Sequence, residues 1–338
     1  MRTLLGLLLL LLALPGAALA EEPSPPYTLI AADRLRLDGE PSAPSELTCQ
    51  ESLADACWSR HLALNTTEDM TAAGGVVPRE GRKPRRMLGA LVALGDFVVT
   101  AANATLGYDR ESFHVNKEDF FGQSTADGGA DKASHFVDYY IVSKELTNIY
   151  RLLDFSEREA LIWGFAVATL GGVVGEVGDG FQRHGFSWED LLMNTLGAGT
   201  ATLLSATRTH DLVGFRTSHL PGPTYIHDVY SMDLKLAGVA RRLGANIGPL
   251  RFLLLSATYG VKGYRDNSSP DDEERQVGIE IGLNLEEILN SVHARRDTWW
   301  GYLLHMVGDN VRFPYLAVGF RYDLNHNKWR GPNNGNYP

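Results

Sequence analysis

Apolar residues recur at helical spacing through the centre of the chain and alternate with polar residues towards its C-terminal end. The helical part predicts four helices, and the third has an explicit start, because Ser156 and Glu159 have the spacing of a capping box. Glycines recur within the third and fourth helices, which indicates close approach of helix backbones, as at Gly171 and Gly175. The expected helices cover residues 87–104, 131–153, 156–180 and 187–207.

Alternation is clearest in the stretch after residue 219. One side of a strand carries apolar residues and the other glycine and polar residues. The apolar side comprises Val277, Ile279, Ile281, Leu283 and Leu285, and the other side Gly278, Glu280, Gly282 and Asn284. Segments 225–236, 252–261 and 315–324 have a similar pattern. The predicted fold class is therefore α+β: a bundle of about four helices followed by a small antiparallel sheet. Alternation with aromatic residues is also typical of outer-membrane strands, but closed barrels of that kind begin at about eight strands, so we favour a sheet packed on helices.

The first twenty residues have the features of an export signal. Arg2 precedes an apolar run, Leu4 to Leu14, and small residues end at Ala20 as in a cleavage site. The run is too short to span a bilayer comfortably, and no cysteine follows the cleavage site to accept lipid, so we expect an exported chain without an acyl anchor. The expected divisions are 1–20 signal peptide, 21–85 irregular N-terminal segment, 86–210 helical domain, 220–325 strand-rich region and 326–338 flexible tail.

Cysteine content and net charge limit the kinds of function that the protein can have. Cys49 and Cys57, the two cysteines of the chain, could form a disulfide in an oxidising compartment, and two free buried thiols are the alternative. A net charge of -10 argues against binding to nucleic acid or to an anionic membrane surface. The exception is the basic stretch Arg79 to Arg86, which is either a solvated linker or the positive flank of a membrane-contacting helix.

Charged residues at the ends of apolar helices form a candidate site. The second helix opens with an acid, a lysine and a histidine on one face, the third ends with two acids three residues apart, and the fourth opens with an acid and an amide four apart. Burying unpaired charge costs several kcal/mol, so these groups should meet one another, a metal ion, water or a polar ligand. The candidate polar cluster comprises Asp131, Lys132, His135, Glu176, Asp179, Asp190 and Asn194.

The motifs around these residues resemble a known family. They are Asp131-Lys132-Ala133-Ser134-His135-Phe136, Gly175-Glu176-Val177-Gly178-Asp179-Gly180, and Gly185 to Asp190 with Asn194 and Gly197. In this order they are similar to the YfiM-type family of bacterial periplasmic proteins, and more loosely to VanZ-like membrane proteins; upstream, Ser112 to Asn116 and Glu118 resemble the lead-in of longer members. The resemblance covers residues 108–208. It implies an exported protein, periplasmic or associated with the outer membrane, whose biochemical activity is uncharacterised.

Three interpretations of the cluster stay open. The first is a structural or ligand-binding role in which buried ion pairs fix the helices, with Lys132 paired to Glu176 or Asp179, His135 to Asp190, and Asn194 capping a backbone group. The second is a divalent metal site, for zinc or manganese, at His135, Glu176 and Asp179. The third is an enzyme in which His135 and Glu176 act as acid and base on an envelope lipid or glycan while Lys132 holds a phosphate.

Other functions are less well supported. The sequence has no nucleophile-elbow, phosphate-loop or dinucleotide motif, and it indicates no particular cofactor. The apolar segments 87–104, 161–175 and 191–206 leave open insertion of helices into a membrane, although Asp96 interrupts the first of them.

Overall fold

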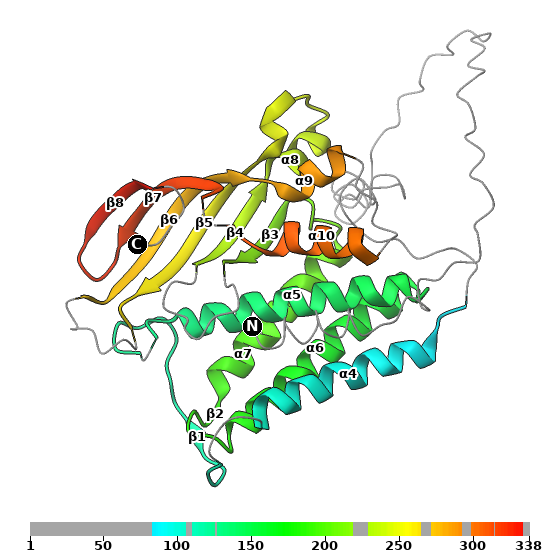
Figure 1. The fold of residues 1–338 in the computed structure, drawn as a ribbon, viewed down its shortest axis with the longest axis vertical. Coiled ribbons are helices and arrows are strands. Elements are labelled where there is room, and N and C mark those ends of the chain that lie inside the picture. The colour runs from blue at the N-terminus through cyan, green and yellow to red at the C-terminus, as the bar shows by residue number, and fades with distance from the viewer. Residues whose placement is uncertain are drawn as a thin grey trace, which may run out of the picture.

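The computed structural model of the chain describes seven stretches of residues (Figure 1). The predicted signal peptide and the Cys49–Cys57 pair lie outside them, as does almost all of the irregular N-terminal segment. The described residues are 83–105, 110–125, 127–218, 229–264, 272–292, 299–313 and 315–333.

All four predicted helices are present. They are α4 (Arg86–Thr105), α5 (Ala130–Leu152), α6 (Glu157–Asp179) and α7 (Trp188–Ala206). Helix α5 is central and contacts both α6 and α7, while α4 packs on α6. Their shared core includes Val142, Leu146 and Val167, all with almost no exposed surface. Burial of these apolar side chains holds the bundle together, since each contributes about 1.5–3 kcal/mol.

Local sequence signals set the helix ends. The Ser156 hydroxyl accepts from the Glu159 backbone N–H and the Glu159 side chain accepts from the Ser156 N–H, so the predicted capping box is confirmed. Helix α7 begins after Ser187, whose hydroxyl accepts from the Asp190 N–H. Glycine permits the α5–α7 crossing, because a Cβ on Gly197 would lie 2.1 Å from the backbone oxygen of Phe136.

The predicted antiparallel sheet is confirmed and is larger than expected. It is a meander in which each strand pairs with the next along the chain, in the order β3-β4-β5-β6-β7-β8. The fold class is therefore α+β. The strands are β3 (Val213–Thr217), β4 (Val229–Lys235), β5 (Leu253–Lys262), β6 (Glu274–Leu283), β7 (Ala317–Asp323) and β8 (Lys328–Asn333).

Several expectations for the C-terminal part are wrong in detail. The predicted flexible tail contains β8, which pairs with the edge of β7 and can hold Pro332 because one side of an edge strand needs no donor. Leu285 begins a helix, not the end of a strand, because Asn284 caps the Glu287 N–H. The region predicted to be strand-rich also contains α8 (Leu236–Leu243), η1 (Gly248–Phe252), α9 (Leu285–Ser291) and α10 (Trp299–Asn310).

The sheet and the bundle meet along α5. In Figure 1 the sheet lies above the four helices of the bundle, and of these four α5 lies nearest to it. Tyr230 of β4 and Val261 of β5 are buried in one apolar cluster with Val137 and Ile141 of α5. Helix α5 is therefore buried on most of its surface, which explains why polar groups on it need partners.

One described helix, α6, is long and apolar enough to cross a membrane by length and composition. Core helices of soluble proteins reach the same hydropathy, so this finding alone assigns no membrane span.

Candidate functional site

The polar cluster forms where three helix ends and one short β-pair converge. Helix α5 contributes its first turns, α6 its last turn and α7 its first turn. The parallel pair β1 (Val115–Asn116) and β2 (Phe186–Ser187) lies beside them and brings the loop after β1 onto the site. Asn116 continues this link, since its amide donates to the backbone oxygen of His184 and to Glu118.

Lys132 is the main cation of the site. Its side chain is 3% exposed, and its Nζ lies 2.5 Å from Glu118 Oε2, 2.8 Å from Asp131 Oδ2 and 2.5 Å from Asp190 Oδ1. Burial lowers the pKa of Lys132, but Asp131 and Asp190 raise it more, so the net pKa lies well above the usual value. Lys132 is thus a fixed ammonium that links α5, α7 and the loop after β1.

His135 is held in place by an amide and a carboxyl group. The distance from His135 Nδ1 to Asn194 Oδ1 is 2.8 Å, and Asn194 Nδ2 donates to Glu176 Oε1 at 3.4 Å. The other oxygen of Glu176 accepts from the Ser187 N–H at 3.4 Å. Because an amide oxygen can only accept, this contact assigns the proton to Nδ1 and leaves Nε2 facing the remaining carboxylates.

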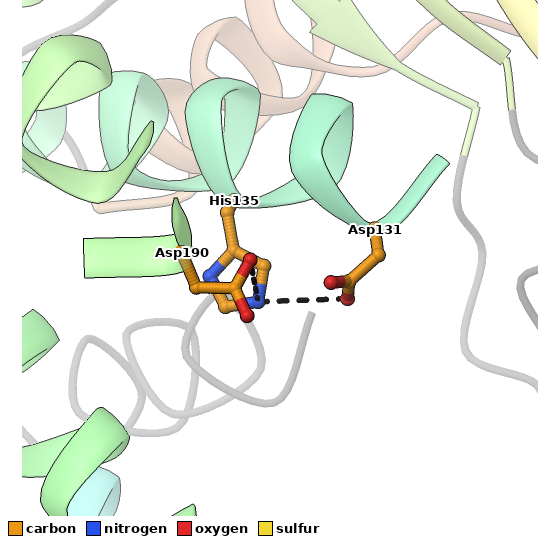
Figure 2. Close-up of side chains that lie close together, drawn as sticks. All are labelled: Asp131, His135 and Asp190. Carbon is orange, nitrogen blue, oxygen red and sulfur yellow. Dashed lines mark ion pairs between the residues drawn. The ribbon is translucent and has the colours of Figure 1, made fainter. Parts of the chain in front are cut away.

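Asp131, His135 and Asp190 surround a common point at the open side of the cluster. His135 Nε2 lies 3.6 Å from Asp131 Oδ1 and 3.8 Å from Asp190 Oδ1, too far for direct hydrogen bonds. Figure 2 shows both carboxylates directed towards the imidazole, one from α5 and one from α7. The side chains of His135 and Asp131 are 24% and 19% exposed, whereas that of Asp190 is 8% exposed and its Oδ1 atom is buried.

The electrostatics favour a cation there. Burial lowers the pKa of His135, but Asp190 and Asp131 raise it well above the usual value. Burial likewise raises the pKa of Asp131, but His135 and Lys132 lower it to well below the usual value. Positive charge at the Nε2 side is therefore stabilised by the two carboxylates that flank it.

Two further carboxyl groups have raised pKa values. Burial and the neighbouring Asp190 and Asp179 raise the pKa of Glu176 to about 8, although His135 opposes the shift. Burial and Asp131 raise the pKa of Asp190 to about 6, against His135 and Lys132. Burial therefore favours the protonated form of both groups, and more strongly for Glu176 than for Asp190.

Some of the predicted pairings are wrong. Lys132 meets Asp131, Asp190 and Glu118 instead of Glu176 or Asp179, because the last turn of α6 lies on the His135 side of the cluster. The Asn194 side chain bonds to His135 and Glu176 and not to a backbone group.

The predicted metal-ligand set also changes. Among the described residues, the set around His135 whose ligand atoms lie within 4.8 Å of one another is Asp131, His135 and Asp190. Glu176 lies near His135 Nδ1, on the side of the ring away from the two aspartates. Asp179 is not in this set, and its charge raises the pKa of Glu176. Helical spacing alone could not distinguish the two sides of the imidazole.

Glu118 joins the site although spacing gives no signal for it. It lies in the loop after β1, fourteen residues before Lys132, and reaches the ammonium because β1 pairs with the strand that leads into α7. In the sequence, only the resemblance to longer family members indicated Glu118.

Comparison with known proteins gives one match. A family model described as "Predicted periplasmic lipoprotein (DUF2279)" matches residues 117–206, about a quarter of the chain. The matched segment begins beside Glu118 and ends with α7, so it contains every residue of the polar cluster. No curated protein and no solved structure matches the chain. The match supports an exported protein of the cell envelope, similar to an uncharacterised periplasmic family.

Proposed function

We propose that this protein binds a divalent metal ion through Asp131, His135 and Asp190, at the envelope of a bacterial cell. The observation that carries the proposal is the separation of 3.6 Å and 3.8 Å between His135 Nε2 and the two carboxylate oxygens. Ligand atoms at about 2.0–2.2 Å from one zinc ion, with angles near 110–120°, lie about 3.3–3.8 Å apart. Nitrogen and oxygen donors of this kind suit zinc or manganese.

The charge of the site supports the same proposal. When His135 is neutral and Glu176 is protonated, the carboxylates of Glu118, Asp131 and Asp190 face the single ammonium of Lys132. Two negative charges then remain, which a divalent cation would neutralise. Without metal, protonation of His135 supplies part of this compensation, so metal and proton compete for the same nitrogen.

A supporting shell stands behind the ligands. Metal-bound histidines almost always donate their second ring N–H to an oxygen that fixes the ring, and Asn194 Oδ1 occupies that position for His135. Asn194 is in turn held by Glu176, and Glu176 by the Ser187 N–H.

The test is metal titration of the purified mature protein by calorimetry. We expect one equivalent of Zn²⁺ or Mn²⁺ to bind near pH 7 and to release protons, measured as a dependence of the binding enthalpy on the buffer. His135→Ala and Asp190→Asn should abolish binding, and Asn194→Ala should weaken it by about 10–100-fold. Glu111→Gln is the control, because Glu111 is an exposed carboxylate outside the polar cluster, and this variant should bind metal as the wild type does. No binding to the wild type at millimolar metal would contradict the proposal.

A second candidate is an enzyme that modifies an envelope lipid or glycan. Its support is the divergence of acidities within one site: the pKa of Glu176 rises to about 8, whereas that of Asp131 falls well below its usual value. Lys132 is a poor phosphate ligand for such a reaction, since three carboxylates already surround it. Lipid and glycan extracts of cells that carry wild type or folded Glu176→Gln should then differ by mass spectrometry, and identical extracts would count against the enzyme.

The proposal also covers the family of the protein and its location within the envelope. The order of the three motifs supports membership of the YfiM-type family and a position at the outer membrane. Fractionation of the host envelope on a density gradient tests the second point, since a protein found only with the soluble periplasm would contradict it.

A further inference from the structure

The sheet carries buried charge on one face and apolar side chains on the other. On the first face, Arg216 pairs with Asp233, and Arg321 pairs with Glu280, all four nearly inaccessible to solvent. On the second face, Tyr230 packs on α5, whereas Met232 and Leu234, farther along the same strand, are exposed. Soluble sheets with one exposed face bury their apolar residues and expose the polar ones. The neighbouring residues along these strands, which point the other way, are therefore the ones that need explanation.

The outward-pointing residues of β4 to β7 form a continuous apolar face. By strand register, Met232, Ala257, Ile279 and Phe320 form one row across four strands. Ile279 is 64% exposed and Phe320 is 55% exposed. No charged residue interrupts this row.

A second row lies directly beside the first. It consists of Leu234, Leu255, Ile281 and Val318, and again contains no charged or polar side chain. On the other side of the first row, Tyr322 and Trp329 face each other across β7 and β8, and Trp329 is 71% exposed. We call the two aliphatic rows and this aromatic pair the apolar face. Contiguous exposed apolar patches of this kind mark contact with a partner or a membrane.

We propose that the apolar face of the sheet lies in the hydrocarbon of an envelope membrane. The apolar face has no charged side chain, as contact with hydrocarbon requires. The protein's net charge of -10 disfavours attraction to anionic headgroups, so binding would depend on the apolar contact. The aromatic pair at its edge matches the preference of tyrosine and tryptophan for the membrane–water interface. Outward apolar and inward polar residues on alternating positions are the pattern of lipid-facing strands.

The extent of the exposed apolar surface favours lipid over a second protein. Exposed apolar side chains also occur on α4, at Met87, Leu91 and Leu94, and on α7, at Trp188 and Leu203. A single docked protein covers one patch, about 800 Å² per partner in a standard interface. Lipid can cover surfaces on several elements at once and needs no matching shape.

The test uses flotation of the full mature chain with uncharged vesicles of phosphatidylethanolamine and phosphatidylcholine. We expect the wild type to float, and to float equally in high salt, because contact with hydrocarbon is not screened. Ile279→Lys should lower the bound fraction at least about tenfold, since lysine on a lipid-facing strand is strongly disfavoured. Leu243→Lys is the matched control: Leu243 is 75% exposed at the end of α8, outside the apolar face, and should leave flotation unchanged.

Each other outcome overturns the proposal. Flotation of Ile279→Lys at the wild-type level, with a folded variant by circular dichroism, would exclude the sheet. Loss of binding in Leu203→Lys but not in Ile279→Lys would assign the lipid contact to the helices. A wild type that does not float, and instead forms a dimer by sedimentation that Ile279→Lys dissociates, would identify a second copy of the chain as the occupant. The proposal is independent of the metal site, because none of these variants touches it.

Discussion

Charged side chains are buried both in the sheet and in the helical bundle, but they are arranged differently. In the sheet, Glu280 lies between Arg312 and Arg321, and donors and acceptors meet at hydrogen-bond distance with no exposed side. In the bundle, carboxylates outnumber the fixed cation, and His135 and Asp131 at the edge of the set are partly exposed. Buried charges that are all paired stabilise one structure, whereas partly exposed charges with an excess of carboxylates can bind a ligand.

The largest expected effect comes from breaking the sheet network. Arg321→Met leaves Glu280 buried with one partner removed, which should lower the free energy of unfolding by about 3–5 kcal/mol. Metal binding by the surviving folded protein should be unchanged. Arg86→Met is the control: Arg86 pairs with Glu159, and their side chains are 78% and 39% exposed, so the loss should stay below about 1 kcal/mol. Denaturant unfolding measures the free energy of unfolding of both variants. Equal losses would contradict the expected difference between a buried and an exposed ion pair.

A smaller effect is expected from removing the cation of the site. Lys132→Met should cost about 2–3 kcal/mol, less than in the sheet because Asp131 and Glu118 keep contact with water. Added Zn²⁺ or Mn²⁺ should restore more stability to this variant than to the wild type, since a metal ion can replace the lost charge. Thermal melts with and without metal test this, and an equal gain in both proteins would argue for a purely structural cluster.

The smallest effect concerns a buried acid of the bundle outside the cluster. Burial raises the pKa of Asp96 to about 7, and its Oδ2 atom has no hydrogen-bond partner. The folded state therefore holds the proton more tightly than the unfolded state, and stability should fall as pH rises from about 4 through 7. Asp96→Asn should flatten this slope and stabilise the protein at pH 8 by roughly 1–3 kcal/mol.

Denaturant unfolding from pH 5 to pH 8 measures the slope for Asp96. Part of it should remain in Asp96→Asn, because the raised pKa of Glu176 acts in the same direction. Asp119→Asn, which changes an exposed carboxylate, should leave the whole slope in place. An unchanged slope in Asp96→Asn would show that Asp96 is ionised in the folded protein.

Much of the fold follows from short-range signals in the sequence. Apolar spacing and the caps at Ser156 and Ser187 define the four helices, because these signals act within one or two turns. Alternation identifies β6 from its own residues. The edge strand β8 lacks such a signal, since its position depends on pairing with β7. The short helix α8 has local signals that the strand prediction for 225–236 did not use, among them Arg241 and Arg242 in its last turn and Gly244 at its C-terminal end.

The sequence by itself determined which residues of the helix ends carry charge, and so where a site could form. Only the tertiary structure decided that Lys132 meets Glu118, that His135 turns one nitrogen to Asn194 and the other to Asp131 and Asp190, and that the sheet presents its apolar face outward. Spacing fixes the face of a helix on which a side chain lies, but partners across helices depend on crossing angles and on contacts between residues far apart in the chain. The direction of a sheet face depends in the same way on what the rest of the chain covers.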